Sequence, residues 1–199
     1  MSRSAAPTIV SFYTPNWEYP AYAARLRASC ARLGLPHVIE ELPDRGGWLA
    51  NGWQKPAFIL EKMEQVQRPL LWVDADNELV GAPTGLRDDV DFMAVAREGT
   101  RYERKKEWTW CVWVMFFNPT PGAMKLLRSW ASERNGTDAS DDRAFERVWQ
   151  RVRNEVRGAA LPPEYAKKKG SIVRMGNSTW AVKKKELRAH RKARTGVAA

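Results

Sequence analysis

Apolar residues recur along this chain in two patterns, short β-type runs and longer helical stripes. Residues 8–13 form a run rich in β-branched and aromatic side chains, which a Thr-Pro-Asn turn ends. Over residues 19–33 the apolar positions have helical spacing, and Gly34 is placed to end that helix. Residues 37–42 form the next strand-like run. A strand, a helix and a strand in this order predict a β-α-β unit with a parallel pair of strands.

The same alternation continues through most of the chain. Residues 70–73 are all apolar, which is typical of a strand buried on both faces. A loop rich in Gly and Trp is predicted over residues 43–52. Further helices are predicted at 56–66, 123–133 and 141–156, and further loops at 97–108 and 135–140. Further strands are predicted at 91–96 and 171–175, and residues 110–117 are predicted to form one strand or a pair of strands. The alternation predicts the α/β class, with a mostly parallel, Rossmann-like sheet flanked by helices.

The positive charge of the chain is concentrated at its C-terminal end. The net charge of the 199 residues is +10, and from residue 165 onward eleven Lys and Arg stand against one acid. The rest of the chain is therefore neutral. A basic segment of this kind favours a polyanion such as DNA or RNA, and a solvated terminus is the alternative. The lysines expected to contact nucleic acid are Lys167, Lys168, Lys169, Lys183, Lys184 and Lys185.

No segment of the sequence is typical of a membrane span or a secretion signal. The longest apolar runs are far too short to cross a bilayer, and the N-terminal residues lack an apolar stretch of signal-peptide length. The two cysteines, Cys30 and Cys111, lie in apolar surroundings, which favours buried free thiols. We therefore expect a cytoplasmic protein with no membrane span.

Asp74 and Asp76 are the strongest chemical signal in the sequence. They follow the apolar run 70–73 directly, and ligands of α/β sheets bind beyond the carboxyl ends of the strands. Two carboxylates two residues apart reach the same side of an extended chain, where they repel each other unless a cation lies between them. Mn²⁺ or Mg²⁺ fits such oxygen ligands. The alternative is a solvated turn, because Asp-x-Asp is a common triplet.

Several segments together resemble one enzyme family. Residues 70–83, LLWVDADNELVGAP, resemble the Asp-x-Asp segment of GT-A nucleotide-diphospho-sugar transferases, which are glycosyltransferases. Residues 54–59, QKPAFI, resemble the Lys-Pro segment upstream of it. Residues 116–123, followed by a helix and then by residues 141–145, resemble the downstream block. The resemblance implies a GT-A-like catalytic domain over residues 1–163, with residues 164–199 as a basic extension.

The resemblance also implies a donor site. Tyr13 and Thr14 would contact the nucleotide, and Lys55 would lie near the diphosphate of a nucleotide sugar, for which a UDP-sugar is expected. Asp74 would contact the donor, and Asp74 and Asp76 would hold the metal. Lys55 has a simpler alternative as a surface residue at a helix start.

The acceptor side follows from the same resemblance. Asp141 or Asp142 would face the acceptor hydroxyl, and in an inverting enzyme one of them would act as general base. Both acids also suit the first turn of a helix, where the helix dipole favours them. Trp48, Trp53 and Trp108 lie in predicted loops, where they could stack on a sugar or a base.

The sequence departs from the family at one position. Many metal-dependent members carry a histidine near the C-terminal end, and here the matching stretch, residues 172–178, has Arg174 and Met175 in its place. His190 lies in the basic segment and is a poor substitute. Arg174 is a candidate for binding phosphate instead.

These observations leave three hypotheses about function. The first is a glycosyltransferase that modifies nucleic acid, with a hydroxymethylated pyrimidine in DNA as the acceptor and the basic segment as the DNA contact. The second is the same enzyme acting on a protein, a glycan or a small molecule. The third is a basic nucleic-acid-binding protein without enzymatic activity.

Overall fold

A six-stranded sheet forms the centre of the fold. The computed structural model describes residues 6–97, 109–133, 140–166, 171–174 and 176. Within these residues the strand order is β2-β1-β3-β6-β5-β7, and β6 is the one strand antiparallel to its neighbours. The mostly parallel sheet is thus confirmed. The strands are β1 (Thr8–Tyr13), β2 (His37–Glu41), β3 (Leu70–Val73), β5 (Phe92–Ala96), β6 (Trp110–Phe117) and β7 (Gly158–Ala160).

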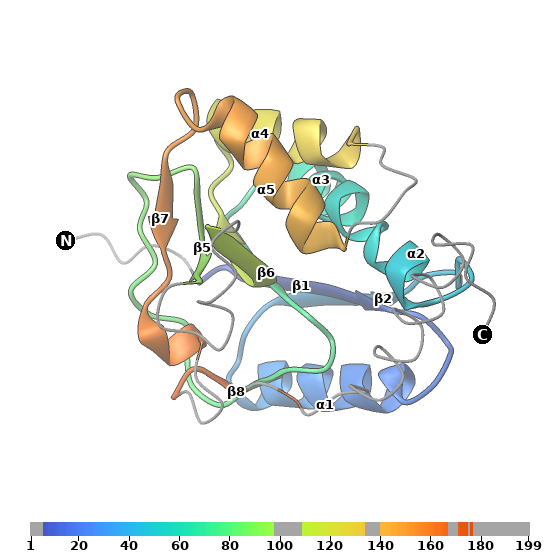
Figure 1. The fold of residues 1–199 in the computed structure, drawn as a ribbon. Coiled ribbons are helices and arrows are strands. Elements are labelled where there is room, and N and C mark those ends of the chain that lie inside the picture. Colours follow the sequence, from blue (N-terminus) through green and yellow to red (C-terminus); the bar gives the residue numbers. More distant parts are fainter. Residues whose placement is uncertain (1–5, 98–108, 134–139, 167–170, 175, 177–199) are drawn as a thin grey trace.

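Helices cover both faces of the sheet (Figure 1). One face packs against α1 (Tyr19–Arg32), whose buried residues join one apolar cluster with β3 and β6. The other face packs against α3 (Lys55–Val66), α4 (Pro121–Ala131) and α5 (Asp141–Val152), which share a second apolar cluster. This three-layer arrangement explains why all four residues of β3, which lies between β1 and β6, are buried and apolar.

Local signals in the sequence account for several element ends. Gly34 follows α1 with a φ of +64°, the left-handed conformation that often ends a helix and suits glycine. Thr120 precedes α4, and its hydroxyl accepts a hydrogen bond from Ala123 N at 3.2 Å while donating to Asp91 Oδ1 at 2.7 Å. Cys30 and Cys111 are buried free thiols, as predicted.

Two segments differ from the sequence-based expectation. A short helix, α2 (Trp48–Gly52), occupies part of the predicted loop at 43–52. Helix α5 ends at Val152 rather than near residue 156, and the chain then forms β7, which pairs with β5. Neither element has a local signal, because α2 is one turn long and β7 is a three-residue Gly-Ala-Ala strand. A tertiary contact helps to fix β7, because a Cβ at Gly158 would lie 2.6 Å from the Phe92 ring.

The chain returns to the sheet after residue 163. A 3₁₀ turn, η1 (Pro163–Tyr165), is followed by β8 (Val173–Arg174), which pairs antiparallel with β4 (Glu78–Leu79). Tyr165, Ile172 and Val173 are buried in the same cluster as α1. Tyr165, Ile172 and Val173 therefore belong to the core of the catalytic-like domain, beyond its predicted end at residue 163. Residues 177–199 lie outside the described residues, and for them a separate basic segment stays a prediction. In the described part of the chain, no helix combines the length and apolar character that a membrane crossing requires.

Candidate active site

The predicted site residues meet at the carboxyl edge of the parallel strands. Strands β1 and β3 are parallel neighbours, with Val10 opposite Trp72, so Thr14 and Asp74 follow them at the same edge. Helices α3 and α5 begin at this edge, with Lys55 and Asp141 as their first residues. Residues far apart in the sequence thus come together because two strands end and two helices begin at one place.

A buried lysine is the centre of this site. The Nζ atom of Lys55 lies 2.9 Å from Asp74 Oδ1 and 2.5 Å from Asp141 Oδ2, and it donates to the carbonyl of Val112 at 3.3 Å. Lys55 is 5% exposed. Burial alone would lower the pKa of its ammonium, but the charges of Asp141 and Asp74 outweigh burial and raise that pKa above its ordinary value. Lys55 is therefore an internal cation, and the alternative of a surface lysine is wrong.

Asp74 is fixed on two sides. Its Oδ1 atom also accepts a hydrogen bond from Trp72 Nε1 at 2.9 Å, and its backbone N–H donates to the carbonyl of Trp113 at 2.9 Å. Burial raises the pKa of Asp74 to about 6; Lys55 lowers it, and the charges of Asp76 and Asp141 raise it. Asp74 is thus held in place beside both the ammonium of Lys55 and other carboxylates.

Asp142 is the second residue of α5, and its charge acts on Lys55. Its Oδ1 atom accepts a hydrogen bond from the backbone N–H of Val112 at 3.2 Å. Burial first, and then the charge of Asp141, raise the pKa of Asp142 to about 7, although Lys55 opposes this. A carboxyl group with a pKa near 7 suits proton transfer at neutral pH.

Replacing Asp142 with asparagine should stabilise the protein in neutral solution. The pKa of Asp142 is higher in the folded than in the unfolded protein, so between about pH 4 and pH 7 the folded protein binds more protons than the unfolded one. The free energy of unfolding therefore falls as pH rises through that window. At about 1.4 kcal/mol per pKa unit, reduced for partial exposure, we expect Asp142→Asn to gain on the order of 1–3 kcal/mol at pH 8. Urea unfolding at pH 5 and at pH 8 measures this. An unchanged pH slope in the variant would contradict the burial of charge at this position.

Asp74 and Asp76 could supply only part of the ligands that a divalent cation needs. Asp76 follows Asp74 by two residues, and its charge affects Asp74, so two hard oxygen ligands stand side by side. Among the described residues, no three Asp, Glu, His or Cys side chains are grouped to hold a metal by themselves. A cation here would fit if a diphosphate and water completed its shell, because Mg²⁺ and Mn²⁺ commonly bind through few carboxylates plus phosphate oxygens.

Tyr13 and Thr14 lie at the end of β1, as expected, with different surroundings. Tyr13 is partly exposed, and the guanidinium of Arg27 lies 5.2 Å from the centre of its ring. Thr14 is buried, donates a hydrogen bond to Asn16 Oδ1 and accepts one from Asn51 Nδ2 at 3.4 Å. Tyr13 is thus available to a ligand, whereas the hydroxyl of Thr14 is engaged with the protein.

The C-terminal segment passes beside the acids. Arg174, in β8, lies 3.3 Å from Glu78 and is more than half exposed. The backbone N–H of Gly176 donates to Asn77 Oδ1 at 3.2 Å, and a Cβ at Gly176 would lie 1.8 Å from the carbonyl oxygen of Asp76. Position 176 therefore requires glycine, because the two backbones meet there.

The three tryptophans proposed as acceptor contacts have different places. Trp48 is the first residue of α2, and Trp53 follows α2 and packs partly on the apolar cluster of α3. Trp108 lies outside the described residues, as do Lys167, Lys168, Lys169, Lys183, Lys184 and Lys185. A role in acceptor binding stays a prediction for all of them.

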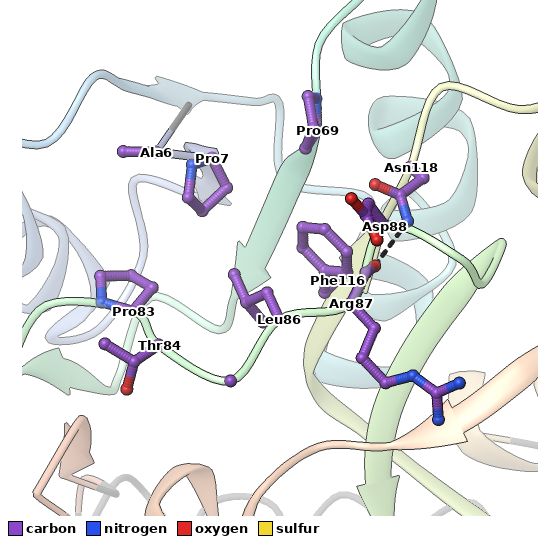
Figure 2. A pocket seen from close by; sticks show the side chains of 11 residues that line it. Ala6, Pro7, Pro69, Pro83, Thr84, Leu86, Arg87, Asp88, Phe116 and Asn118 are labelled. Atoms are coloured by element: carbon purple, nitrogen blue, oxygen red, sulfur yellow. Dashed lines mark hydrogen bonds between the residues drawn. The ribbon is translucent and has the colours of Figure 1, made fainter. Parts of the chain in front are cut away.

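A separate hollow of about 130 Å³ lies at the opposite edge of the sheet (Figure 2). Pro7 and Pro69 stand just before β1 and β3, and Phe116 and Asn118 come from the end of the antiparallel β6. The hollow is thus at the amino ends of the parallel strands, whereas Asp74 and Asp76 are at the carboxyl ends. It is not part of the acidic site.

Sequence reasoning missed three contributors to the site. The apolar run 70–73 identifies Trp72 only as a buried strand residue. Its spacing of two from Asp74 is a signal for the hydrogen bond between them, because it places both side chains on one side of the strand. Asn51 and Gly176 had no distinguishing pattern, because their partners Thr14 and Asp76 are 37 and 100 residues away. Such contacts are set by the topology alone.

The fold is similar to that of glycosyltransferases of known structure. No family model matches the chain, and no curated protein is significantly similar to it. Among solved structures, a glycosyltransferase involved in the glycosylation of the major capsid of PBCV-1 is similar with a TM-score of 0.66 and 15% identity, over 91% of this chain and 99% of that chain. Two structures of the glycosyltransferase GlyE from Streptococcus pneumoniae TIGR4 have TM-scores of 0.51 and 0.50 at 13% identity, over 80% of this chain and 46% of theirs.

Proposed function

We propose that this protein is a glycosyltransferase that takes a sugar from a nucleotide-sugar donor bound at the carboxyl edge of β3. The observation that carries the proposal is the convergence of Asp74, Asp141 and Asp142 around the ammonium of Lys55, with Asp76 following Asp74 by two residues. An excess of carboxylates in a partly desolvated place favours a cation, and a cation favours a diphosphate. The shared fold with glycosyltransferases supports the same conclusion.

Each residue has a chemical part in this proposal. Asp74 and Asp76 would hold Mn²⁺ or Mg²⁺, which when bound neutralises charge on the departing nucleoside diphosphate. Lys55 orients Asp74 and Asp141 through its two ion pairs. Asp142, with its pKa of about 7, is the better candidate to accept the proton of the acceptor hydroxyl.

A screen of nucleotide sugars tests the proposal. The full chain is mixed with UDP-, GDP-, CDP- and TDP-sugars, with Mn²⁺ or with EDTA, and its melting temperature is measured. We expect one nucleotide class to raise the melting temperature with Mn²⁺ and to do so less with EDTA, because a ligand that binds only the folded state stabilises it. No response to any nucleotide sugar, with release of no nucleoside diphosphate on prolonged incubation, would refute the proposal.

For the acceptor we propose a nucleic acid, on the strength of the charge distribution. A neutral body with a strongly basic C-terminal segment suits a polymer of phosphates. The same screen therefore includes hydroxymethylated DNA beside unmodified DNA and a simple sugar. Sugar incorporation into the hydroxymethylated DNA, weakened by added salt, is the expected result; transfer to the sugar alone would favour a glycan acceptor.

A further inference from the structure

Asn51 is a buried amide at the meeting point of three segments. It is 6% exposed, and its Oδ1 atom accepts a hydrogen bond from the backbone N–H of Arg45 at 2.7 Å. Its Nδ2 atom donates to Asp44 Oδ1 at 2.8 Å and to Thr14 Oγ1 at 3.4 Å. One side chain thus joins the end of β1, the loop after β2 and helix α2.

The loop after β2 is shaped to present Asp44 to this amide. The backbone N–H groups of Gly46 and Gly47 also point to Asp44 Oδ1, at 3.0 and 3.4 Å. Both glycines have positive φ, +92° and +130°, which other residues rarely adopt. The hydrogen bond from Asn51 is the main cause that lowers the pKa of Asp44, so this acceptor is ionised at neutral pH.

The hydrogen bonds of Asn51 hold helix α2 in position. The helix has five residues, too few to be stable alone, and Asn51 is its one buried residue. No apolar side chain of α2 is buried to take over this function. The amide therefore anchors a segment that would otherwise be loosely held.

The far end of α2 lies close to Asp141. A Cβ built on Gly52 would lie 3.9 Å from Asp141 Cγ, the distance of ordinary van der Waals contact, so a single methyl group would fill the space between them. Only Trp53 and Gln54 separate Gly52 from Lys55 at the start of α3. A shift of α2 would therefore be passed on to both Asp141 and Lys55.

We infer that Asn51 is a positioning residue for donor binding, which ties the end of β1 to α2 and so sets the place of the Lys55–Asp141 pair. This inference rests on the proposed function, and it assigns a role to a residue that touches no catalytic atom itself. Small displacements of binding groups cost much in such sites: an error of about 1 Å can cost roughly 100-fold.

Replacing the donor of this hydrogen bond by an acceptor tests the inference. In Asn51→Asp a carboxylate faces Asp44 instead of an amide, so two anions meet where a hydrogen bond was. We expect the affinity for UDP with Mn²⁺, measured by calorimetry at pH 8, to fall by roughly 10-fold or more. The matched control is Asn154→Asp, the same substitution at an exposed residue that follows α5; it should bind UDP as the wild type does.

Exchanging the two side chains distinguishes a positioning role of Asn51 from a general loss of folding. The double variant Asp44→Asn with Asn51→Asp restores one amide and one carboxylate, and we expect it to regain most of the lost affinity. Equal affinity of Asn51→Asp and wild type, or no recovery in the double variant, would overturn the inference.

A measurement without ligand keeps this test independent of the proposed function. Hydrogen exchange of the backbone amides should accelerate together at residues 13–16 and 48–55 in Asn51→Asp, and return toward wild-type rates in the double variant. Unchanged exchange in these segments would overturn the inference. If the wild type binds none of UDP, GDP, CDP and TDP, the proposed function fails, and the exchange rates still decide whether Asn51 couples the two segments.

Discussion

Replacing Lys55 with methionine should cost about 3–5 kcal/mol of unfolding free energy at pH 8 and remove donor binding. Methionine fills a similar volume but leaves Asp74 and Asp141 without the ammonium that lies 2.9 and 2.5 Å from them. A buried charge without its partner is strongly destabilising. The loss should be smaller at pH 5, because Asp74 and Asp142, with pKa values raised to about 6 and 7, take up protons there. Urea unfolding at both pH values, together with UDP binding, measures the effect.

The same helix offers a matched control. Lys62 is also buried, at 4% exposure, and also has two acidic partners, Glu40 and Glu61, each 2.9 Å from its Nζ. These acids are 43% and 56% exposed, so water can solvate them once the lysine is gone. Lys62→Met should therefore cost less than about 1 kcal/mol and leave UDP binding intact. If both variants lost the same unfolding free energy and the same affinity for UDP, Lys55 would have no special role in donor binding.

Replacing Asp76 with asparagine should lower sugar transfer by roughly 100-fold or more, because it removes one of two charged ligands for the cation that offsets charge on the leaving group. Asp76 also acts on Asp74, because its charge adds to burial in raising the pKa of that carboxyl group. The expected pattern is the loss of the Mn²⁺-dependent rise in melting temperature in the presence of UDP, with each protein compared with its own melting temperature without ligand.

The control for this variant lies at the other edge of the sheet. Asp88 is exposed and lines the hollow of Figure 2, away from the carboxyl ends of β1 and β3. Asp88→Asn makes the same chemical change and should keep the full response to UDP with Mn²⁺. If Asp76→Asn keeps that response as well, Asp74 and Asp76 do not hold the metal, and the donor site must be sought elsewhere.

Hydrophobic patterning predicted the main elements of the fold because each buries a complete face. The strand at 70–73 matches β3 residue for residue, and the helix predicted at 19–33 matches α1 within one residue. The patterning could not predict α2 or β7, which are five and three residues long. It also could not give the antiparallel direction of β6, because strand direction depends on the path of the connections rather than on the residues of the strand.

Part of the candidate site could be predicted from the sequence for a related reason. Asp74 follows a strand of four apolar residues, so its position at the carboxyl edge of the sheet could be inferred. Asp141 is the first residue of a strongly amphipathic helix, so its position at a helix start could be inferred as well. That both bind one lysine could not be inferred, because Lys55 looks like any residue before a proline. The raised pKa values of Asp74 and Asp142 arise from burial and from neighbours distant in the sequence, which no local pattern encodes.

The pairing of β8 with β4 has a practical consequence for separating the basic segment from the rest of the chain. Removal of everything after residue 163 would take away Ile172 and Val173 and uncover apolar surface beside α1. It would also remove Gly176, whose backbone N–H is bonded to Asn77 next to Asp76. A shortened protein meant to test whether the lysines at 183–185 bind DNA should therefore end after Gly176. An earlier stop would disturb the surroundings of Asp76, and the resulting loss could be mistaken for a loss of acceptor binding.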